Sequence, residues 1–398
     1  MVFVHVEDFF HPNAGYQVNQ LSRLQVKQGH EVFVITSELE KIPNYLTDFF
    51  GKDNITEKDR HFEESSGVKV IRHPLYGYYS GRAIFKTGLR KVIKSLRPDV
   101  LFVHGEDTLT GIILILNYRN MNMPYVLDSH MLELASMNRF RSVFRWFFRN
   151  LITPIILRNQ LPMIRVVDSD FLEKHYNIPL EKTKLLKFGT DTEFYRPSET
   201  QRMKFRMEHG ISERDFVVVY AGKLNEEKGG MFLAKALQKR ISLEKREIHF
   251  VIIGNTTNDS YGKQVEVTLE KSENRIIRFE TQNYLNLALF YQPADIAVFP
   301  RQCSMSYFEV QSCGLAVILE ENEINNNRVQ NKRGMLFEEN CEANFRDKIT
   351  NFGNMSEADF STYQKNARRN ILENFNYVTI AQEFSDVMVD EYLRFHKK

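Results

Sequence analysis

The sequence has few cysteines and no long apolar run. Only three of its 398 residues are cysteines. They form neither a C-x-x-C pair nor a cluster with histidines at metal-ligand spacing, so we expect reduced thiols in a cytoplasmic protein. No apolar run approaches the ~18 residues that cross a bilayer. The amino-terminal "MVFVHVEDFF" has no basic leader and is interrupted by polar residues, so we expect no signal peptide.

The sequence also lacks a large excess of positive or negative charge. The formal net charge is +2, with 26% charged and 42% hydrophobic residues, which is typical of a soluble globular protein. Such a balance excludes a function that depends on global charge, so any basic surface must be local. A chain of this length exceeds one ordinary core, and two domains are expected.

Short β-branched runs alternate with helical patterns along most of the chain. Examples are "VFVHV", "EVFVIT" and "VLFVH" in the first half, and "FVVVYAG", "IHFVIIG" and "IAVFP" in the second. This alternation predicts an α/β protein with parallel sheets covered on both faces. The polar segment "TDTEFYRPSETQRMKF" separates two such sets, so we predict domains at 1–196 and 197–375. Residues 376–398 form a final amphipathic helix.

Two lysines lie close together in "AGKLNEEKGGMFLAKAL". Lys223 and Lys228 follow a predicted strand, and two glycines open the next helix. Ammonium groups beside a helix N-terminus favour an anion such as phosphate. Glu226 and Glu227 lie between the lysines, so a solvated surface loop is an equal alternative.

Two further segments have a structural and a functional interpretation. In "SMSYFEVQSCG", Ser306 and Glu309 have the S-x-x-E spacing of a capping box, yet a carboxylate there could also accept hydrogen bonds from ligand hydroxyls. In "HPNAGYQ", Gly15 would let the backbone approach a phosphate. A plain turn between strand and helix explains the same glycine.

Histidines follow two predicted strands, at the edge where open α/β sheets bind ligands. They are His104 in "LFVHGED" and His130 in "YVLDSHMLE", and a hydrogen-bonded structural role is the commoner explanation for either one. "DSD" at 168–170 and "DTE" at 191–193 have D-x-D spacing. Both fit turns and helix caps better than metal ligands, so no metal is predicted.

Six arginines and no acid or lysine occur between positions 134 and 167. Arg141, Arg145 and Arg149 recur every four residues and are interleaved with aromatics that include Trp146. Such a helix suits an interface with anionic lipid headgroups. A core helix whose arginines extend to solvent is the alternative, and nothing like a nucleic-acid recognition module accompanies the stretch.

These segments, in this order, resemble the retaining glycosyltransferases of GT-B fold known as family 4. The resemblance covers nearly the whole chain, and order and spacing make it specific. It rests on "HPNAGYQVNQLSRLQVKQGHEVFVIT", "RPDVLFVHGED", "PYVLDSHMLE" and "DSDFLEKHYNIPLEKTKLLKFGTDTEFYRP", and then on "VVVYAGKLNEEKGGMFLAKAL", "HFVIIGN", "FEVQSCGLAVI" and "NKRGMLFEEN". It implies two Rossmann-like domains facing across a cleft, an acceptor site on the first and a donor site on the second. The last helix would pack back on the first domain.

The resemblance also implies roles for individual residues. Lys228 matches the lysine on the donor diphosphate, Lys223 replaces the usual arginine, and His130 matches the histidine that faces the transferred sugar; these three are the predicted catalytic residues. The first acid of the E-x7-E pattern is replaced by Arg301, and the loop from Pro300 to Glu309 is shorter than the common form. Hydroxyls and backbone N–H groups of "QCSMS" are therefore expected to substitute for the acid. The predicted donor-binding set is Gly15, Gly222, Lys223, Lys228, Ser304, Ser306 and Glu309.

The resemblance therefore predicts a metal-independent retaining hexosyltransferase that uses a nucleoside diphosphate sugar and no cofactor. The arginine-aromatic stretch suggests a lipid-linked saccharide acceptor for a surface polysaccharide or glycoconjugate, and a peripheral position on the inner face of an anionic membrane. The absent acid supports one alternative, a catalytically weak partner that binds or stabilises another glycosyltransferase. A sugar-nucleotide epimerase or phosphorylase of the same fold is disfavoured by the two lysines.

Overall fold

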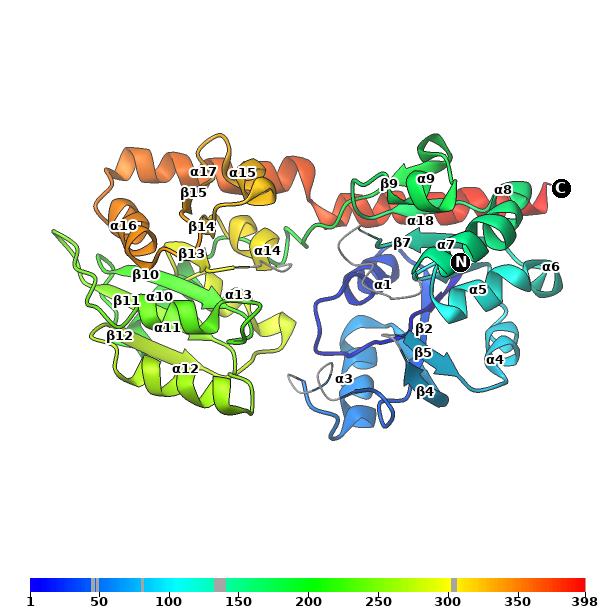
Figure 1. Cartoon of the computed structure of the whole chain (residues 1–398), viewed down its shortest axis with the longest axis horizontal. Coiled ribbons are helices and arrows are strands. Elements are labelled where there is room, and N and C mark those ends of the chain that lie inside the picture. The colour runs from blue at the N-terminus through cyan, green and yellow to red at the C-terminus, as the bar shows by residue number, and fades with distance from the viewer. Residues whose placement is uncertain (44–46, 48–49, 80–81, 132–140, 302–305, 398) are drawn as a thin grey trace. The chain divides into compact units, whose positions relative to one another are not determined.

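The computed structural model describes the chain except residues 44–46, 48–49, 80–81, 132–140, 302–305 and 398 (Figure 1). The chain forms two compact units. The N-terminal unit comprises Met1–Phe188 and Tyr377–Lys398, and the C-terminal unit comprises Gly189–Asn376. The predicted boundary at 196/197 lies inside the second unit. Tyr195 explains the difference, because its buried ring packs in that unit's core and its hydroxyl donates to the Tyr284 carbonyl at 2.8 Å.

The N-terminal unit is built on a seven-stranded parallel sheet with the order β3-β2-β1-β6-β7-β8-β9. In chain order its strands are β1 (Val2–Val6), β2 (Glu31–Ser37), β3 (Lys69–His73), β6 (Val100–Val103), β7 (Tyr125–Ser129), β8 (Met163–Arg165) and β9 (Thr183–Leu185). An antiparallel pair, β4 (Leu75–Tyr79) and β5 (Arg82–Phe85), stands apart from the sheet. The β-branched runs predicted as buried strands are therefore confirmed.

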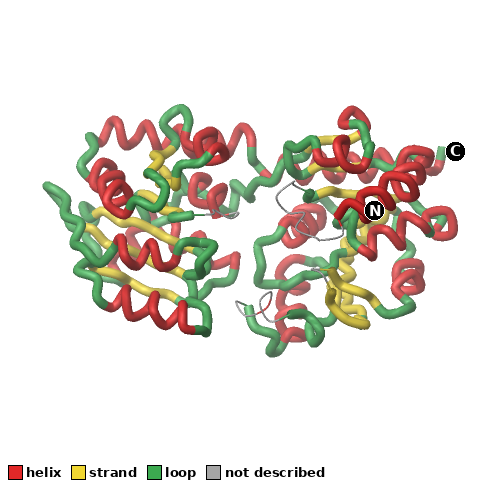
Figure 2. Tube along the Cα trace, viewed as in Figure 1, coloured by secondary structure: helices red, strands yellow, loops and turns green. Residues whose placement is uncertain are grey.

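Helices cover this sheet on both faces (Figure 2). They are α1 (Gln17–Lys27), α3 (Ile55–Ser66), α4 (Leu89–Ser95), α5 (Leu109–Leu116), α6 (Tyr118–Met121), α7 (Arg141–Phe147), α8 (Thr153–Asn159), α9 (Phe171–Tyr176) and α18 (Tyr377–His396), with a π-helical turn η2 (Phe148–Ile152) and a 3-10 turn η3 (Leu180–Lys182). In α1 the face that carries Val18, Leu21 and Leu24 is buried. Gly29 follows the helix with φ +90°, a backbone conformation that favours glycine.

The last helix, α18, packs on the N-terminal unit (Figure 1, red). It contacts α1, β6 and β7. Its buried residues Ala381, Phe384 and Met388 join the core that contains Phe102 and Val126. A segment from the far end of the sequence thus completes one face of the first sheet.

The C-terminal unit has a six-stranded parallel sheet with the order β12-β11-β10-β13-β14-β15. The strands are β10 (Phe216–Ala221), β11 (Ile248–Ile253), β12 (Arg275–Phe279), β13 (Ile296–Phe299), β14 (Ala316–Glu320) and β15 (Gly334–Phe337). The helices are α10 (Glu199–Glu208), α11 (Gly230–Ala236), α12 (Ser260–Glu270), α13 (Ala288–Tyr291), α14 (Ser306–Ser312), α15 (Glu323–Val329), α16 (Glu342–Gly353) and α17 (Glu357–Asn374), with a 3-10 turn η4 (Tyr284–Asn286). Apolar cores lie on both faces of this sheet as well.

Candidate active site

Acids and histidines gather where β1, β6 and β7 end in the N-terminal unit. The buried carboxylate of Asp128, on β7, is the centre of this group: its Oδ2 lies 2.9 Å from Nδ1 of His104 and 3.2 Å from Nε2 of His130. Its Oδ1 accepts a hydrogen bond of 2.8 Å from the Gly105 N–H. The His130 side chain is 39% exposed, whereas that of Asp128 is fully buried. The predicted residue His130 is therefore held in place by a carboxylate beneath it.

The protonation of this pair follows from its contacts. Burial alone would raise the pKa of Asp128, but the positive charges of His130 and His104 and their hydrogen bonds hold that pKa well below its usual range. Burial works to lower the pKa of His130, and the Asp128 carboxylate outweighs it, so the pKa of His130 is raised. At neutral pH, Asp128 is an anion and His130 carries more positive charge than an ordinary histidine.

Four more acids lie at the same edge of the sheet, and none of them was among the residues predicted for the site. Burial raises the pKa of Glu7, Glu106 and Asp107. Burial and the neighbouring Glu7 raise the pKa of Asp8 to about 7. Glu7 and Asp8 directly follow β1, and Glu106 and Asp107 come after His104 and Gly105 at the end of β6. The position of all four acids shortly after a strand was the available signal. Crowded carboxyl groups of this kind are common at functional sites.

One group of described residues could hold a cation. His104, Asp128 and His130 each place one ligand atom within 4.8 Å of the others. The shortest contacts in the group are those of ordinary hydrogen bonds. The D-x-D segment at 191–193 forms a turn, in which Oδ1 of Asp191 accepts from the N–H of Glu193 at 3.1 Å and of Phe194 at 3.0 Å. The Asp191 carboxylate thus accepts hydrogen bonds from the backbone of its own turn.

In the C-terminal unit, the loop between β10 and α11 carries the predicted lysines. The Gly222 N–H donates to Ile253 O at 3.0 Å, and the carbonyl of Lys223 accepts from the Tyr220 hydroxyl at 2.7 Å. The N–H of Lys228 donates to Oδ1 of Asn225 at 3.1 Å. Both lysine side chains are half-buried. The loop is therefore folded on itself and is more than a solvated connection.

Arg301 ties this loop to its neighbour. Its Nη1 donates to Glu226 O at 3.2 Å, and its Nη2 donates to Oδ1 of Asn340 at 3.2 Å. Gly229 lies alongside with φ +75°, and a Cβ there would come within 3.0 Å of Pro300. The residue that replaces the first family acid therefore connects two loops. Ser304 lies outside the described residues.

Glu309 lies on α14 and is only 2% exposed. Its Oε2 accepts a hydrogen bond of 3.1 Å from the Tyr291 hydroxyl, and burial raises its pKa to about 8. The described part of α14 begins at Ser306, and the residues just before it lie outside the described residues, so the capping box stays a prediction. In the N-terminal unit, the predicted Gly15 precedes α1 by two residues, and its carbonyl accepts from Nε2 of Gln20 at 3.1 Å.

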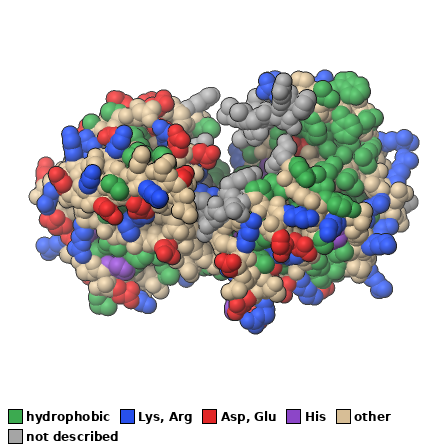
Figure 3. Space-filling model, turned by 60° about the horizontal axis from the view of Figure 1, so that its bottom comes forward, with side chains coloured by type: hydrophobic (Ala, Val, Ile, Leu, Met, Phe, Trp, Pro, Cys, Tyr) green, Lys and Arg blue, Asp and Glu red, His purple; other side chains and the backbone are tan. Residues whose placement is uncertain are grey.

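The arginine-aromatic stretch contains both exposed side chains and side chains that contact the rest of the N-terminal unit. Trp146 is 64% exposed and Arg141 is exposed on α7, whereas Phe144 and Phe147 of the same helix are partly buried and pack against the core. Two predicted arginines contact protein: the guanidinium of Arg145 lies 5.3 Å from the Phe171 ring centroid, and Nη2 of Arg149 donates to His175 O at 3.3 Å. Figure 3 shows hydrophobic side chains gathered over this unit. None of the described helices combines the length and apolarity needed to span a bilayer.

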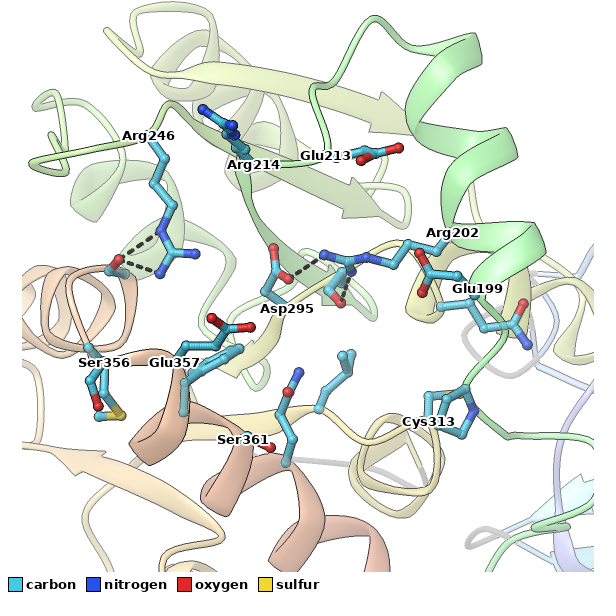
Figure 4. A pocket seen from close by; sticks show the side chains of 18 of the residues that line it. Glu199, Arg202, Glu213, Arg214, Arg246, Asp295, Cys313, Ser356, Glu357 and Ser361 are labelled. Carbon is cyan, nitrogen blue, oxygen red and sulfur yellow. Dashed lines mark hydrogen bonds and ion pairs between the residues drawn. The ribbon is translucent and has the colours of Figure 1, made fainter.

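A cavity of about 1030 Å³ lies at the other edge of the second sheet, where β10, β13 and β14 begin (Figure 4). Both acidic and basic side chains line this cavity, and several of them pair with other groups of the protein. Arg202 contacts Asp295 at 2.7 Å, and Arg246 donates to Gly353 O at 2.8 Å through Nε. The predicted donor residues follow the carboxyl ends of β10 and β13, so this cavity is separate from them.

The chain has two α/β units, each built on a parallel sheet with polar residues at the carboxyl ends of its strands. This architecture defines a protein of GT-B fold. Solved structures agree over nearly the full length. A glycosyltransferase from Rickettsia africae has a TM-score of 0.71 at 13% identity and covers 98% of both chains. Anabaena HepE, solved in complex with UDP-glucose, has a TM-score of 0.68 at 15% identity and covers 98% of this chain and 100% of its own.

The family is settled by sequence. Residues 14–154 match the glycosyl transferase 4-like domain, and residues 215–353 match the glycosyl transferases group 1 domain. The chain belongs to the group 1 glycosyltransferases, in agreement with the family 4 resemblance. The D-inositol 3-phosphate glycosyltransferase of Pseudarthrobacter chlorophenolicus is 24% identical over 155 residues, which is 37% of this chain and 36% of that relative. The aligned part thus spans about a third of the relative's length.

Proposed function

We propose that this protein transfers a hexosyl group from a nucleoside diphosphate sugar to a saccharide hydroxyl, with retention at the anomeric carbon and without a metal ion. The observation that carries the proposal is the folded Lys223–Lys228 loop of a group 1 glycosyltransferase, placed after β10 and tied to the loop after β13. Two ammonium groups on one ordered loop suit a diphosphate. The UDP-glucose held by Anabaena HepE supports the same donor class.

The proposed chemistry is electrostatic. The acceptor oxygen forms a bond to the anomeric carbon on the face where the bond to the donor phosphate breaks, and a phosphate oxygen takes the acceptor's proton. Negative charge grows on the leaving diphosphate, and Lys223 and Lys228 would stabilise it. In this scheme Glu309 faces the ribose, and His130, held by Asp128, faces the transferred sugar. Ser304, Ser306, Gly15 and Gly222 complete the proposed donor set.

A panel of nucleotide sugars tests the donor directly. A donor present at about 100 times its Kd adds about 2.7 kcal/mol to the free energy of unfolding, so its binding appears as a rise in Tm. Donor hydrolysis and transfer are then measured for each nucleotide sugar that binds. Failure of every nucleoside diphosphate sugar to raise Tm or to be turned over would refute the proposal.

A catalytically weak partner subunit is the second candidate, and Arg301 favours it. This side chain replaces an acid and is engaged with Glu226 and Asn340. The two candidates are separated by assaying donor turnover for the purified chain alone and for the complex recovered from its own cells. Turnover by the chain alone supports the transferase, whereas turnover only after a second glycosyltransferase joins supports the partner role.

We further propose a lipid-linked acceptor at an anionic membrane surface, in surface polysaccharide or glycoconjugate synthesis. Support comes from exposed apolar side chains on adjoining helices of one unit: Leu109, Ile113 and Leu116 on α5, Val143 and Trp146 on α7, and Leu151 on η2. Arg141, which is exposed on α7, supplies positive charge. Aromatic and basic side chains together suit a lipid headgroup region.

Co-sedimentation with anionic liposomes tests this surface. The double variant Arg141→Glu, Trp146→Ser should lose most of its binding, because Arg141 and Trp146 are exposed. Arg145 and Arg149 are poor choices, since both contact protein. Arg240→Glu, an exposed charge reversal in the other unit, is the matched control. Equal sedimentation of both variants and wild type would contradict the membrane proposal.

A further inference from the structure

The β4–β5 hairpin of the N-terminal unit reaches the edge of the sheet where the acids and histidines gather. Nη2 of Arg82, the first residue of β5, donates to Oδ1 of Asp107 at 3.3 Å. The N–H of Ala83 donates to Oδ2 of Asp8 at 3.2 Å, and Oδ1 of the same carboxyl group accepts from the Thr110 hydroxyl at 3.1 Å. Two acids that follow the strands β1 and β6 therefore hold one end of the hairpin at the candidate active site.

The body of this hairpin is packed into the unit. Leu75 of β4 and Ala83 of β5 are buried in a small apolar cluster with Leu39 and Ile42, and helix α5 contacts β5. A hairpin held by burial and by hydrogen bonds to the site is a fixed support, so the exposed side chains that it carries have defined positions.

An aromatic ring lies at the active-site end of the hairpin. Tyr79 ends β4 opposite Arg82 and is 64% exposed. Its ring rests against Gly77, because a Cβ added to Gly77 would lie 2.5 Å from Cε2 and 3.0 Å from Cζ of Tyr79. A residue with a side chain at position 77 could not leave the ring in this place. Gly77 thus supports part of the ring, and the rest of the ring faces solvent.

An exposed aromatic ring next to hydrogen-bonding groups suits a sugar. A pyranose has C–H groups on its faces and hydroxyls around its rim. The C–H groups pack against the electron-rich face of an aromatic ring, and the hydroxyls accept hydrogen bonds from a guanidinium or donate them to a carboxylate. We propose that the β4–β5 hairpin binds the saccharide part of the acceptor, with the Tyr79 ring as its stacking surface and Arg82 as a donor to its hydroxyls.

The charges around Arg82 favour a neutral sugar over a phosphate or another anion. Arg82 is paired with Asp107, and the carboxyl groups of Asp8, Glu106 and Glu7 also act on its charge. Its positive charge is therefore balanced by the protein and offers an anion little net attraction. The hydroxyls of a neutral sugar can use both the guanidinium and the carboxyl groups.

This inference rests on the proposed function, because it assigns the acceptor saccharide to the hairpin. The two can fail separately, since saccharide binding is measured without a nucleotide sugar. If oligosaccharides bind through Tyr79 and no nucleotide sugar is turned over, only the proposed transfer fails. If transfer occurs and Tyr79→Ala has the same KM for the acceptor as wild type, only the present inference fails.

An array of immobilised neutral and phosphorylated oligosaccharides, probed with the full chain, tests the binding. Titration calorimetry then gives the Kd of the neutral oligosaccharide that binds most tightly. We expect Tyr79→Ala to raise this Kd by about 10-fold, and Tyr79→Phe to stay within about threefold of wild type because it keeps the ring. Tyr76→Ala is the matched control, since Tyr76 lies on the same strand, is 57% exposed and should bind as wild type does. Binding of phosphorylated oligosaccharides alone, or equal Kd values for Tyr79→Ala and Tyr76→Ala, would overturn the proposal.

Gly77→Ala tests the position of the ring while Tyr79 is kept. The new Cβ needs the space that Cε2 and Cζ of Tyr79 occupy. Because these atoms form the far end of a side chain that can rotate, we expect the ring to move and the hairpin to stay folded, with a Tm close to that of wild type. The Kd should rise by about fivefold or more, and the double variant Gly77→Ala, Tyr79→Ala should bind no more weakly than Tyr79→Ala alone. Additive losses in the double variant, or a wild-type Kd for Gly77→Ala, would overturn the stacking role.

Discussion

Replacing Glu309 with glutamine removes an ionisable group from the interior of the C-terminal unit. The carboxyl group is 2% exposed and accepts a hydrogen bond from Tyr291. A glutamine oxygen can accept the same bond. The substitution therefore changes the ability to ionise and leaves the size and the bonding nearly unchanged.

The expected magnitude follows from the pKa. Burial raises the pKa of Glu309 from 4.5 to about 8, so the folded state favours the protonated acid. This contribution to stability is fully present below about pH 4.5 and is lost as the pH rises through about 8. At about 1.36 kcal/mol per pKa unit, the loss reaches on the order of 5 kcal/mol at alkaline pH. Glutamine does not ionise, so the variant does not lose this stability at alkaline pH.

The assay is urea unfolding of wild type and Glu309→Gln between about pH 5 and about pH 9. The two proteins should have similar stability at the acid end, and the variant should be the more stable one at the alkaline end. Glu270→Gln, an exposed position on α12, should follow wild type throughout. If Glu309→Gln is no more stable than wild type at the alkaline end, the carboxyl group is not buried as described.

Two further substitutions test the C-terminal unit. Asp295→Ala should reduce the free energy of unfolding by about 3–5 kcal/mol, because it leaves the buried guanidinium of Arg206 without its carboxylate at 2.9 Å. Urea unfolding measures this free energy, and a loss below about 1 kcal/mol would refute the prediction. Arg301→Ala should weaken nucleoside diphosphate binding while the exposed bond to Glu226 contributes little to stability. Titration calorimetry and a melting curve separate the two effects, and unchanged affinity would contradict the loop-tying role.

The fold was predictable where local pattern and burial coincide. Runs such as "FVVVY" are buried on both faces as β10, and the alternation with helices requires parallel sheets. The domain boundary was not predictable to the residue, because Tyr195 belongs to the second unit through contacts with Tyr284, 89 positions later in the chain. The polar residues and the proline near the predicted boundary at 196/197 give no indication of this distant contact.

The site was predictable as a set of residue types and less so as a set of contacts. The sequence places His104 and His130 after strands, but only the register of β6 and β7 brings both to Asp128. Four-residue spacing suggested one guanidinium face, whereas Arg145 and Arg149 turn toward Phe171 and His175. In each case a partner distant in sequence decides the geometry.

Lys228 tests the central claim most directly. We predict that Lys228→Ala lowers kcat/KM for sugar transfer by about 30-fold to several hundred-fold, corresponding to about 2–4 kcal/mol of transition-state stabilisation. Lys235→Ala, an exposed lysine on the adjoining helix α11, should stay within a few-fold of wild type. Equal kcat/KM values for Lys228→Ala and Lys235→Ala would contradict the assignment of the β10–α11 loop as the diphosphate site.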